Sequence, residues 1–384
     1  MAPIRVGIIG LSSVTTNKSA SPGDGWAASA HLPYLIQSPH YEITALCNSS
    51  VESAEAAIKR HKLPPSTKAY GSPEDLAKDP NVDIVVCSVR VDRHYALTMP
   101  SLKTGKAVFV EWPLGSNLQQ AEEMLAAAKQ SGSKTIVGLQ SRPSPFIQKV
   151  KELVETKHVG ELVSSNLVYV SGTTAEVGPP GIDYLIKKKV GGNFLTIHFG
   201  HITDAALYAL GGIKELSGQL STRWSEMKYL NSDGSFNSVV KRETPDHIAL
   251  QGTLNAADAP FNVTFRQGKA FPDTPKLAWH ILGTKGEIRV TANAPISLAL
   301  GGEKIEVHDH DTDKVDVIDV EYGAAVRDLS SPFAKNIGAL YELYATGGSV
   351  GDGLVSFEEA VGMHKILDGI EKSSDGKKWE TIKA

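Results

Sequence analysis

The sequence predicts an α/β protein in which a doubly wound parallel sheet precedes an α+β domain with a large, open, mostly antiparallel sheet. Its 384 residues exceed the roughly 250 to 300 residues at which one hydrophobic core stops growing. Apolar runs alternate with helical patterns up to about residue 140, and runs of period two follow. We therefore expect one domain at residues 1–140 and a second at residues 141–384.

Five short apolar runs predict the strands of the first domain. They read "IRVGIIG", "YEITALC", "DIVVCSV", "AVFVEW" and "KTIVGLQ". Such nearly continuous apolar strands are typical of a parallel sheet that helices cover on both faces. The segments between them, "HLPYLIQS", "VESAEAAIKRH", "RHYALTMPSLKTG" and "LQQAEEMLAAAKQSG", have the apolar spacing of those helices.

The second domain begins with the helical pattern "PSPFIQKVKELVETKH". Alternating runs such as "ELVSSNLVYVSG", "HIALQGTL", "FNVTFRQG" and "GEIRVTA" follow it. Because successive side chains of a strand point to opposite faces, this alternation predicts a sheet with one face covered. A last helix, at about residues 356–373, is expected to pack back on the rest of the chain.

Composition excludes several classes of function. Hydrophobic residues make up 41% of the chain, charged residues 21%, and the formal net charge is -4. The only compact basic run, Lys187–Lys189, is too short to follow a phosphate backbone, so no nucleic acid is expected. No run approaches the roughly 20 apolar residues of a membrane span. Cys47 and Cys87 lie in apolar strand-like runs, which predicts buried free thiols and a cytoplasmic or nuclear location.

The turn after the first predicted strand is the first candidate ligand site. Open parallel sheets bind ligands at the carboxyl ends of their strands, and a glycine-rich first turn accepts phosphates. Here Gly10 ends the strand, the segment 11–22 intervenes, and "GDGWAASA" then gives the pattern G-x-G-x-x-A. The alternative is a surface excursion with no ligand. The cofactor contacts expected from this region are Gly10, Ser12, Ser13, Gly25 and Trp26.

The end of the second predicted strand bears on the choice of cofactor. Dinucleotide-binding domains usually carry Asp or Glu there for the ribose hydroxyls, whereas this strand runs into Cys47, Asn48 and Ser49. Since no carboxylate would repel a 2′-phosphate, we expect NADP(H), with NAD(H) also acceptable, and assign Asn48 and Ser49 as cofactor contacts.

Several stretches together resemble the family of glucose-fructose oxidoreductase, inositol dehydrogenase and MocA, on the fungal branch that contains the galactose-pathway repressor. They include "APIRVGIIGL", "GWAASAHLPYL", "VFVEWPL", "LQSRPSP", "FGHITD" and "TPDHIALQGTL", and the resemblance covers nearly the whole chain. It implies an N-terminal Rossmann domain. It also implies a C-terminal sheet that covers the nicotinamide and commonly mediates oligomers.

The resemblance also implies where the catalytic groups should be. Dehydrogenases of the family typically carry Glu-Lys-Pro after this strand, but here Trp112 stands between Glu111 and Pro113. They also carry Asp-x-Gly-x-His, where this chain has Ile197 in place of the aspartate. His201 matches the family's histidine. Two of the three usual catalytic side chains are therefore missing.

His201 is the leading candidate for proton transfer, because an imidazole titrates near neutral pH. Trp112 cannot donate a proton, but its ring can stack on the cofactor or a substrate, or simply close the strand end as an apolar plug. His198 would share a helical face with His201. Tyr184 lies in the loop that approaches the substrate in family members, and is a reserve donor.

The remaining candidates follow the ends of later strands. The resemblance assigns Ser88, Val89, Arg90 and His94 to the nicotinamide side, and we expect Glu111, Trp112 and Gln140 to contact the cofactor as well. Arg142 would hold a substrate carboxylate or bridge the domains. Trp112 and His198 are expected to contact substrate too.

A metal site is not expected. The run "VHDHDTDKVDV" contains His308, Asp309, His310 and Asp311, but neighbouring side chains of a strand point to opposite faces, which favours a polar hairpin rim.

Two functions remain open from the sequence. The first is an NAD(P)-dependent oxidoreductase that acts on a small polyol, sugar, carbonyl or imine, with His201 as proton carrier and a homodimer or higher oligomer as assembly. The second is a non-catalytic NAD(P)-binding regulator with a protein partner, which the loss of the lysine and the aspartate favours.

Overall fold

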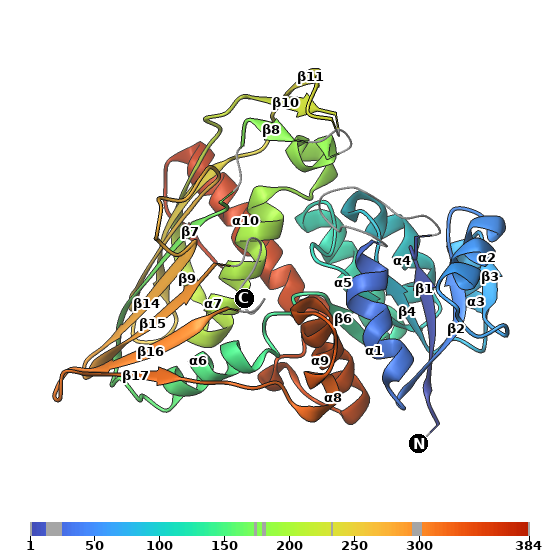
Figure 1. Cartoon of the computed structure of the whole chain (residues 1–384), viewed down its shortest axis with the longest axis horizontal. Helices are drawn as coiled ribbons and strands as arrows, with labels where there is room; N and C mark the ends of the chain where they lie inside the picture. Colours follow the sequence, from blue (N-terminus) through green and yellow to red (C-terminus); the bar gives the residue numbers. More distant parts are fainter. Residues whose placement is uncertain are drawn as a thin grey trace. The chain divides into compact units, whose positions relative to one another are not determined.

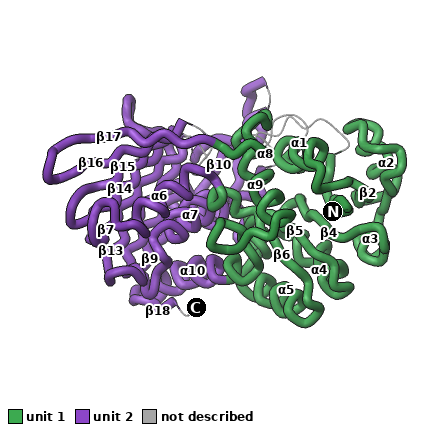
Figure 2. The backbone as a smooth tube through the Cα atoms, turned by 90° about the horizontal axis from the view of Figure 1, so that it is seen from below, with its two compact units in different colours: residues 1–143, 189–192, 322–361 green, residues 144–188, 193–321, 362–384 purple. Residues whose placement is uncertain are grey.

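The computed structural model describes residues 2–12, 25–172, 175–178, 182–231, 233–293 and 302–382. The chain forms two compact units, shown in Figure 2: residues 1–143, 189–192 and 322–361 in the first, and residues 144–188, 193–321 and 362–384 in the second. The chain thus passes between the units at several points, the first of them after Pro143.

The first unit contains a six-stranded sheet with the order β3-β2-β1-β4-β5-β6. All neighbouring strands are parallel. The strands are β1 (Ile4–Ile9), β2 (Tyr41–Cys47), β3 (Lys68–Tyr70), β4 (Ile84–Cys87), β5 (Ala107–Val110) and β6 (Thr135–Val137). This confirms the predicted doubly wound parallel sheet and adds the short strand β3.

The register brings the carboxyl ends of the central strands to one level. Ile9 pairs with Cys47 on one side and Cys87 on the other, and Cys87 pairs with Val110. The residues that follow these strands therefore lie along one edge of the sheet. Cys47 and Cys87 are buried free thiols, as predicted, and burial raises their pKa values to about 11 and about 12.

Helices flank this sheet (Figure 1). They are a π-helical turn (Ala27–His31), α1 (Leu32–Gln37), α2 (Val51–Arg60), α3 (Pro73–Lys78), α4 (His94–Lys103), α5 (Leu118–Ser131), α8 (Ala324–Arg327) and α9 (Pro332–Thr346). Short polar side chains set where three of them start. Ser50, Ser72 and Asn117 each accept a hydrogen bond from a first-turn N–H of α2, α3 and α5.

Helix α9 follows the whole large sheet in sequence, yet it belongs to the first unit. It packs on α1 and on the π-helical turn before α1. Tyr341 of α9 stacks on Tyr34 with ring centroids 5.8 Å apart and meets the ring of Tyr41 edge-on. An aromatic cluster thus fastens this late segment to the N-terminal sheet.

The second unit is dominated by a nine-stranded sheet with the order β17-β16-β15-β14-β7-β13-β12-β9-β18. Only β7 and β13 pair in parallel, so the sheet is mostly antiparallel, as predicted. Its strands are β7 (Leu162–Val170), β9 (Ile213–Ser221), β12 (His247–Leu254), β13 (Pro260–Arg266), β14 (Leu277–Gly283), β15 (Gly286–Ala292), β16 (Lys304–Asp309), β17 (Lys314–Ile318) and β18 (Glu380–Thr381).

One face of this sheet is covered and the other is open. The helices on the covered face are α6 (Pro145–Glu155), a π-helical stretch (Phe194–Phe199) that continues into α7 (Gly200–Leu210), and α10 (Phe357–Gly376) (Figure 1). Gly218 of β9 lets α10 come close, since a Cβ there would lie 2.8 Å from Ile370. On strand β7, Val168 is exposed on the open face, whereas its neighbours Leu167 and Tyr169 are buried on the covered one. The last helix predicted at about 356–373 is α10.

A small sheet with the order β11-β10-β8 completes the second unit. Its strands are β8 (Val177–Gly178), β10 (Glu226–Leu230) and β11 (Phe236–Lys241). At the hairpin between β16 and β17, His308 lies 2.8 Å from Asp313 as an ion pair. In the part of the chain that is described, no three His, Cys, Asp or Glu side chains are grouped as a metal site would need. No described helix has the length and apolar character to cross a bilayer.

Candidate nucleotide-binding site

Gly10 makes the turn at the end of β1 possible. Its φ of +101° lies in the left-handed region that side chains other than hydrogen rarely adopt. A Cβ at this position would lie 2.4 Å from Cγ1 of Val89 and 2.5 Å from the carbonyl oxygen of Ser88. The backbone after β1 therefore passes directly against the loop after β4, and only glycine fits there.

A cavity of about 430 Å³ lies beside this turn, wholly within the first unit. Gly10, Leu11 and Ser12 form one wall, and Asn48 and Ser49 after β2 form another. The cavity therefore gathers several of the predicted cofactor residues at the carboxyl edge of the parallel sheet, where ligands of such sheets bind. Gly25 and Trp26 are described, whereas Ser13 and most of the segment 11–22 lie outside the described residues.

The lining residues that the sequence reasoning did not assign include Gly71, Pro73, Arg93 and Leu97. These four residues were hard to predict because they are scattered along the chain. Gly71 follows β3, Pro73 starts α3, and Arg93 and Leu97 lie in the turn after β4 and in α4. Among the described residues that line the cavity, Arg93 is the one charged side chain, and none is a carboxylate. The described part of this wall would therefore not repel an anionic diphosphate or 2′-phosphate.

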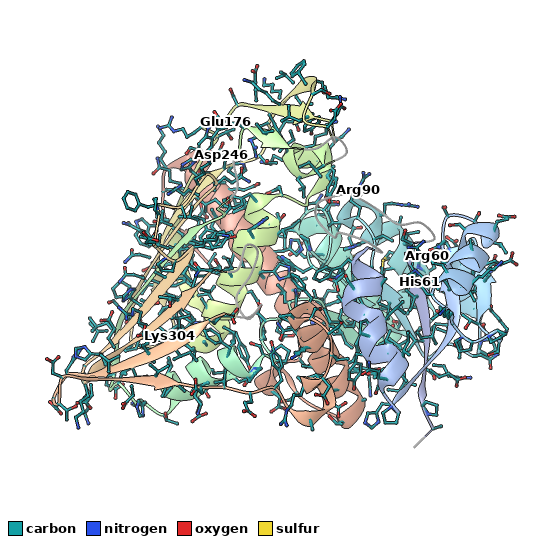
Figure 3. All side chains as sticks on the ribbon, in the orientation of Figure 1. Arg60, His61, Arg90, Glu176, Asp246 and Lys304 are labelled. Atoms are coloured by element: carbon teal, nitrogen blue, oxygen red, sulfur yellow. The ribbon has the colours of Figure 1, made fainter. Side chains whose placement is uncertain are left out.

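Two side chains hold the turn after β1 in place. Asn48 donates its amide N–H groups to the carbonyl oxygen of Leu11, at 2.8 Å, and to that of Ser53, at 3.1 Å. His61, at the end of α2 (Figure 3), donates from Nε2 to the carbonyl oxygen of Ser12 at 2.8 Å. Since the Asn48 amide nitrogen is engaged, its oxygen is the atom left to accept from a ribose hydroxyl. The role of His61 was not predicted.

Farther along the same edge lie Ser88, Glu111, Trp112 and Gln140, after β4, β5 and β6. Each is at most 8% exposed. The Ser88 hydroxyl and the Gln140 amide oxygen are buried without a hydrogen-bond partner among the described residues. An unpaired buried polar group costs roughly 1 to 3 kcal/mol, and these two atoms are free to bond to a ligand at this edge. The indole N–H of Trp26 is also buried without a described partner.

Glu111 and Trp112 start a tight turn. Glu111 lies 2.8 Å from Nε2 of His31, and the bond between Trp112 and Pro113 is cis. Trp112 is 5% exposed. The turn therefore places a carboxylate and an indole at the strand end with little contact to solvent.

Two predicted cofactor residues contact the protein instead. His94 is buried, with its ring nitrogens 2.9 Å from the carbonyl oxygen of Pro113 and 3.0 Å from that of Val89. Burial lowers the pKa of His94, while the two carbonyl oxygens act in the opposite direction. The ring thus links the loops after β4 and β5. Arg90 (Figure 3) is exposed and pairs with Asp92 through two 2.7 Å hydrogen bonds. Both remain predictions as cofactor contacts.

The predicted proton carrier His201 and the predicted substrate contact His198 belong to the second unit. His198 lies on the π-helical stretch, which Asn193 caps through its side chain, and His201 lies on the first turn of α7. The Nδ1 atoms of both rings are buried without a described hydrogen-bond partner. Burial lowers the pKa of His198 to about 4 and, with the neighbouring His198 adding to it, that of His201 to about 3. Both imidazoles are therefore neutral near pH 7.

Tyr184 and Arg142 are less exposed to the solvent than loop residues usually are. Tyr184 is partly buried in a 3₁₀ turn (Asp183–Ile186) of the second unit. Arg142 is 8% exposed in the first unit. The role of Tyr184 as a reserve proton donor and that of Arg142 in holding a substrate stay predictions.

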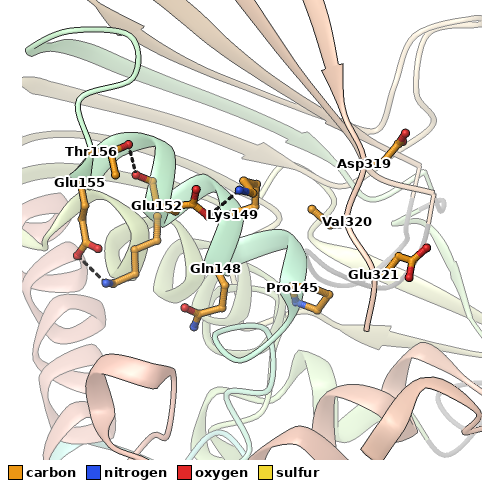
Figure 4. A pocket seen from close by; sticks show the side chains of 10 residues that line it. Pro145, Gln148, Lys149, Glu152, Glu155, Thr156, Asp319, Val320 and Glu321 are labelled. Atoms are coloured by element: carbon orange, nitrogen blue, oxygen red, sulfur yellow. Dashed lines mark hydrogen bonds and ion pairs between the residues drawn. The ribbon is translucent and has the colours of Figure 1, made fainter. Parts of the chain in front are cut away.

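The second unit has a separate cavity of about 540 Å³ between α6 and residues 319–321 (Figure 4). Its lysines are already paired, Lys149 with Glu152 at 2.6 Å and Lys151 with Glu155 at 2.5 Å. None of the predicted site residues lines it. It is a charged surface groove and does not belong to the nucleotide site.

The glycine turn, the cavity at the carboxyl edge and the unpaired polar atoms define the first unit as a dinucleotide-binding domain. Residues 4–139 match the oxidoreductase family with an NAD-binding Rossmann fold, and residues 145–292 match the C-terminal domain of Gal80p.

Two relatives span most of the chain. The dehydrogenase aclE of Aspergillus oryzae is 30% identical over 379 residues, which cover 97% of this chain and 96% of the relative. The galactose/lactose metabolism regulatory protein GAL80 of Saccharomyces cerevisiae is 31% identical over 304 residues, or 76% and 68% of the two chains. The chain therefore belongs to the glucose-fructose oxidoreductase, inositol dehydrogenase and MocA family, in its Gal80-like branch.

Solved structures support the same fold. A super-repressor mutant of Gal80p from Saccharomyces cerevisiae superposes with a TM-score of 0.88 at 26% identity, covering 99% of this chain and 98% of that one. Levoglucosan dehydrogenase in complex with NADH and L-sorbose gives a TM-score of 0.77 at 17% identity, with complete coverage of both chains.

Gly10→Ala should weaken NADPH binding by at least about tenfold, because its Cβ would collide with the loop after β4 and displace the turn. Fluorescence titration with NADPH measures the loss. Gly132→Ala is the matched control, since Gly132 also has a positive φ of 73° but nothing within 4 Å of an added Cβ. Unchanged affinity in Gly10→Ala would contradict the assignment of this turn.

The buried His201 of α7 should make the protein less stable in acid. His201 binds a proton near pH 6.5 when unfolded but only near pH 3 when folded, so stability is fully retained above pH 6.5 and falls below it. His201→Gln should therefore lose about 2 kcal/mol less than the parent between pH 7.5 and 5.0, at about 1.4 kcal/mol per pH unit. Thermal unfolding at both pH values tests this. The exposed His158→Gln should behave like the parent, and equal losses in all three proteins would refute it.

Proposed function

We propose that the protein is an NAD(P)-dependent oxidoreductase that transfers a hydride to or from a small polyol, sugar, carbonyl or imine. The observation that carries this proposal is the 430 Å³ cavity at the glycine turn, continued along the same edge by the buried unpaired atoms of Ser88 and Gln140. Similarity to a dehydrogenase over 97% of the chain supports it.

In this proposal, backbone N–H groups of Gly10, Leu11 and Ser12 hold the diphosphate, and Asn48 and Ser49 hold the adenosine ribose. The bound cofactor supplies or takes up the hydride. We propose NADP(H) as the preferred cofactor, with NAD(H) also accepted, because the described lining residues include Arg93 and no carboxylate.

His201 is the proposed proton carrier, with Tyr184 in reserve. A neutral imidazole is the form that accepts a proton from an alcohol as it is oxidised. Burial lowers the pKa of His201 to about 3, so the ring is neutral but weakly basic, and a bound substrate would have to raise this pKa for His201 to take the proton. We assign Trp112, Arg142 and His198 to the substrate side. Trp112 cannot replace the lysine of the family as a proton donor, so it would shape the pocket instead.

A non-catalytic NAD(P)-binding regulator is the second candidate. The observation that favours it is the joint loss of the family's lysine, at Trp112, and of its aspartate, at Ile197. The similarity to GAL80, named as a regulatory protein, supports the same alternative. In that case a protein partner would replace the small substrate.

We further propose a homodimer or higher homo-oligomer and a location in the cytoplasm or nucleus. The open face of the large sheet, where Val168 of β7 is exposed, supports an assembly through the second unit.

His201→Asn should lower kcat by about 100-fold while NADPH affinity stays within about twofold, because the variant removes a proton carrier and not a cofactor contact. The measurement combines NADPH titration with turnover across a panel of polyols, sugars, carbonyls and imines. His158→Asn is the control. Bound NADPH without turnover on the whole panel would favour the regulator.

Trp112→Phe should keep NADPH affinity within about threefold, since a ring still fills the strand end, whereas Trp112→Ala should weaken it by about tenfold. Trp112→Lys should raise turnover of a polyol, because it restores an ammonium where family dehydrogenases act on the substrate oxygen. If all three variants bound and reacted like the parent, Trp112 would be only an apolar plug.

A further inference from the structure

Glu111 ends a chain of buried hydrogen bonds that the sequence pattern did not predict. Its Oε1 atom lies 2.8 Å from Nε2 of His31, and Nδ1 of His31 lies 2.8 Å from the hydroxyl oxygen of Tyr341. All three belong to the first unit. His31 and Tyr341 are 0% exposed and Glu111 is 8% exposed.

The three partners determine where the protons lie. An ionised carboxylate only accepts, so Nε2 of His31 carries the hydrogen and donates to Glu111. The opposite nitrogen then accepts, and the hydroxyl of Tyr341 donates to it. Burial raises the pKa of Tyr341 well above its ordinary value, so the phenol keeps this proton. A neutral histidine therefore satisfies both partners.

Packing leaves the carboxylate a single position. The His31 ring meets Phe109 edge-on at 5.1 Å between ring centroids. The ring of Tyr341 is itself packed against Phe109, with 4.9 Å between the ring centroids. On the other side, a Cβ on Gly138 would lie 2.7 to 2.8 Å from the carboxylate atoms of Glu111. The Glu111 carboxylate is thus held between the His31 ring and the backbone of Gly138.

The neighbouring strand ends offer a complementary set of hydrogen-bonding atoms. Beside Glu111, which accepts, Gln140 has an unpaired amide oxygen that accepts and Ser88 has an unpaired hydroxyl that can donate. A primary carboxamide carries two N–H donors and one carbonyl acceptor. Two acceptors and one donor at the ends of three adjacent strands match that group.

We propose that His31 and Tyr341 are positioning residues that hold the Glu111 carboxylate to accept a hydrogen bond from the carboxamide of a bound nicotinamide. This inference rests on the proposed function, since it requires NAD(P) at the carboxyl edge of the first unit. Neither residue touches the cofactor. Helix α9, which supplies Tyr341, thereby becomes part of the nicotinamide site.

The variants that test the role separate the two hydrogen bonds of His31. In His31→Gln the side-chain amide can still donate to Glu111 from near the Nε2 position, whereas in His31→Asn it is too short to do so. Tyr341→Phe removes only the hydroxyl. Tyr41→Phe is the matched control, because it removes a buried hydroxyl from the same aromatic cluster that is not part of the chain.

Three ligands provide the readout: NADPH, its 3-acetylpyridine analogue, which lacks the amide N–H groups, and 2′-phospho-ADP-ribose, which lacks the nicotinamide. His31→Asn should bind NADPH about tenfold more weakly than the parent, because a charge-assisted hydrogen bond is lost. The same variant should bind the other two ligands within about twofold. Tyr341→Phe should show a smaller loss of the same pattern, and His31→Gln and Tyr41→Phe should match the parent.

Two results would overturn the positioning role: equal weakening of all three ligands in His31→Asn, which indicates general destabilisation, or no weakening in either His31→Asn or Tyr341→Phe. If the parent bound neither NADPH nor 2′-phospho-ADP-ribose, the proposed function would fail together with this inference. If the parent bound both ligands and the variants bound them with the same affinity, only the positioning role would be contradicted.

Discussion

The carboxylate of Glu111 sets the main constraint at the carboxyl edge of the first unit. A buried carboxylate is tolerated only with hydrogen-bond partners, and His31 provides one at 2.8 Å. That bond joins the π-helical turn to the end of β5, and Tyr341 joins both to α9. Gly138 must lack a side chain to leave room. The carboxylate therefore accounts for the residue types found in the π-helical turn, at the end of β5, after β6 and in α9.

The glycine turn and the Glu111 carboxylate lie at two parts of this edge that suit different groups of one ligand. At one end, Gly10 lets the backbone approach the loop after β4, beside a cavity that no carboxylate lines among the residues the structure describes. At the other, Ser88 and Gln140 keep buried polar atoms without described partners. A dinucleotide is both anionic and amide-bearing, so one ligand would satisfy both ends. The register of the parallel strands, which ends β1, β2, β4 and β5 level, makes the arrangement possible.

Local sequence patterns were sufficient for the strands and for residues directly after them. Continuous apolar runs predicted β1, β2, β4, β5 and β6, and position after a strand pointed to Gly10, Asn48 and Gln140. The same reasoning could not find His31 or Tyr341, because Tyr341 is 310 residues away from its partner in sequence. Position alone also did not reveal that His94 and Arg90 bond to their own loops. Side-chain partners depend on tertiary packing, which spacing does not encode.

A crystal structure of the protein with NADPH tests the central claim most directly. The account predicts the diphosphate against the backbone of Gly10 and Leu11, and the carboxamide within hydrogen-bond distance of Glu111 while His31 and Tyr341 keep their places. NADPH bound elsewhere, or with its carboxamide turned away from Glu111, would contradict it.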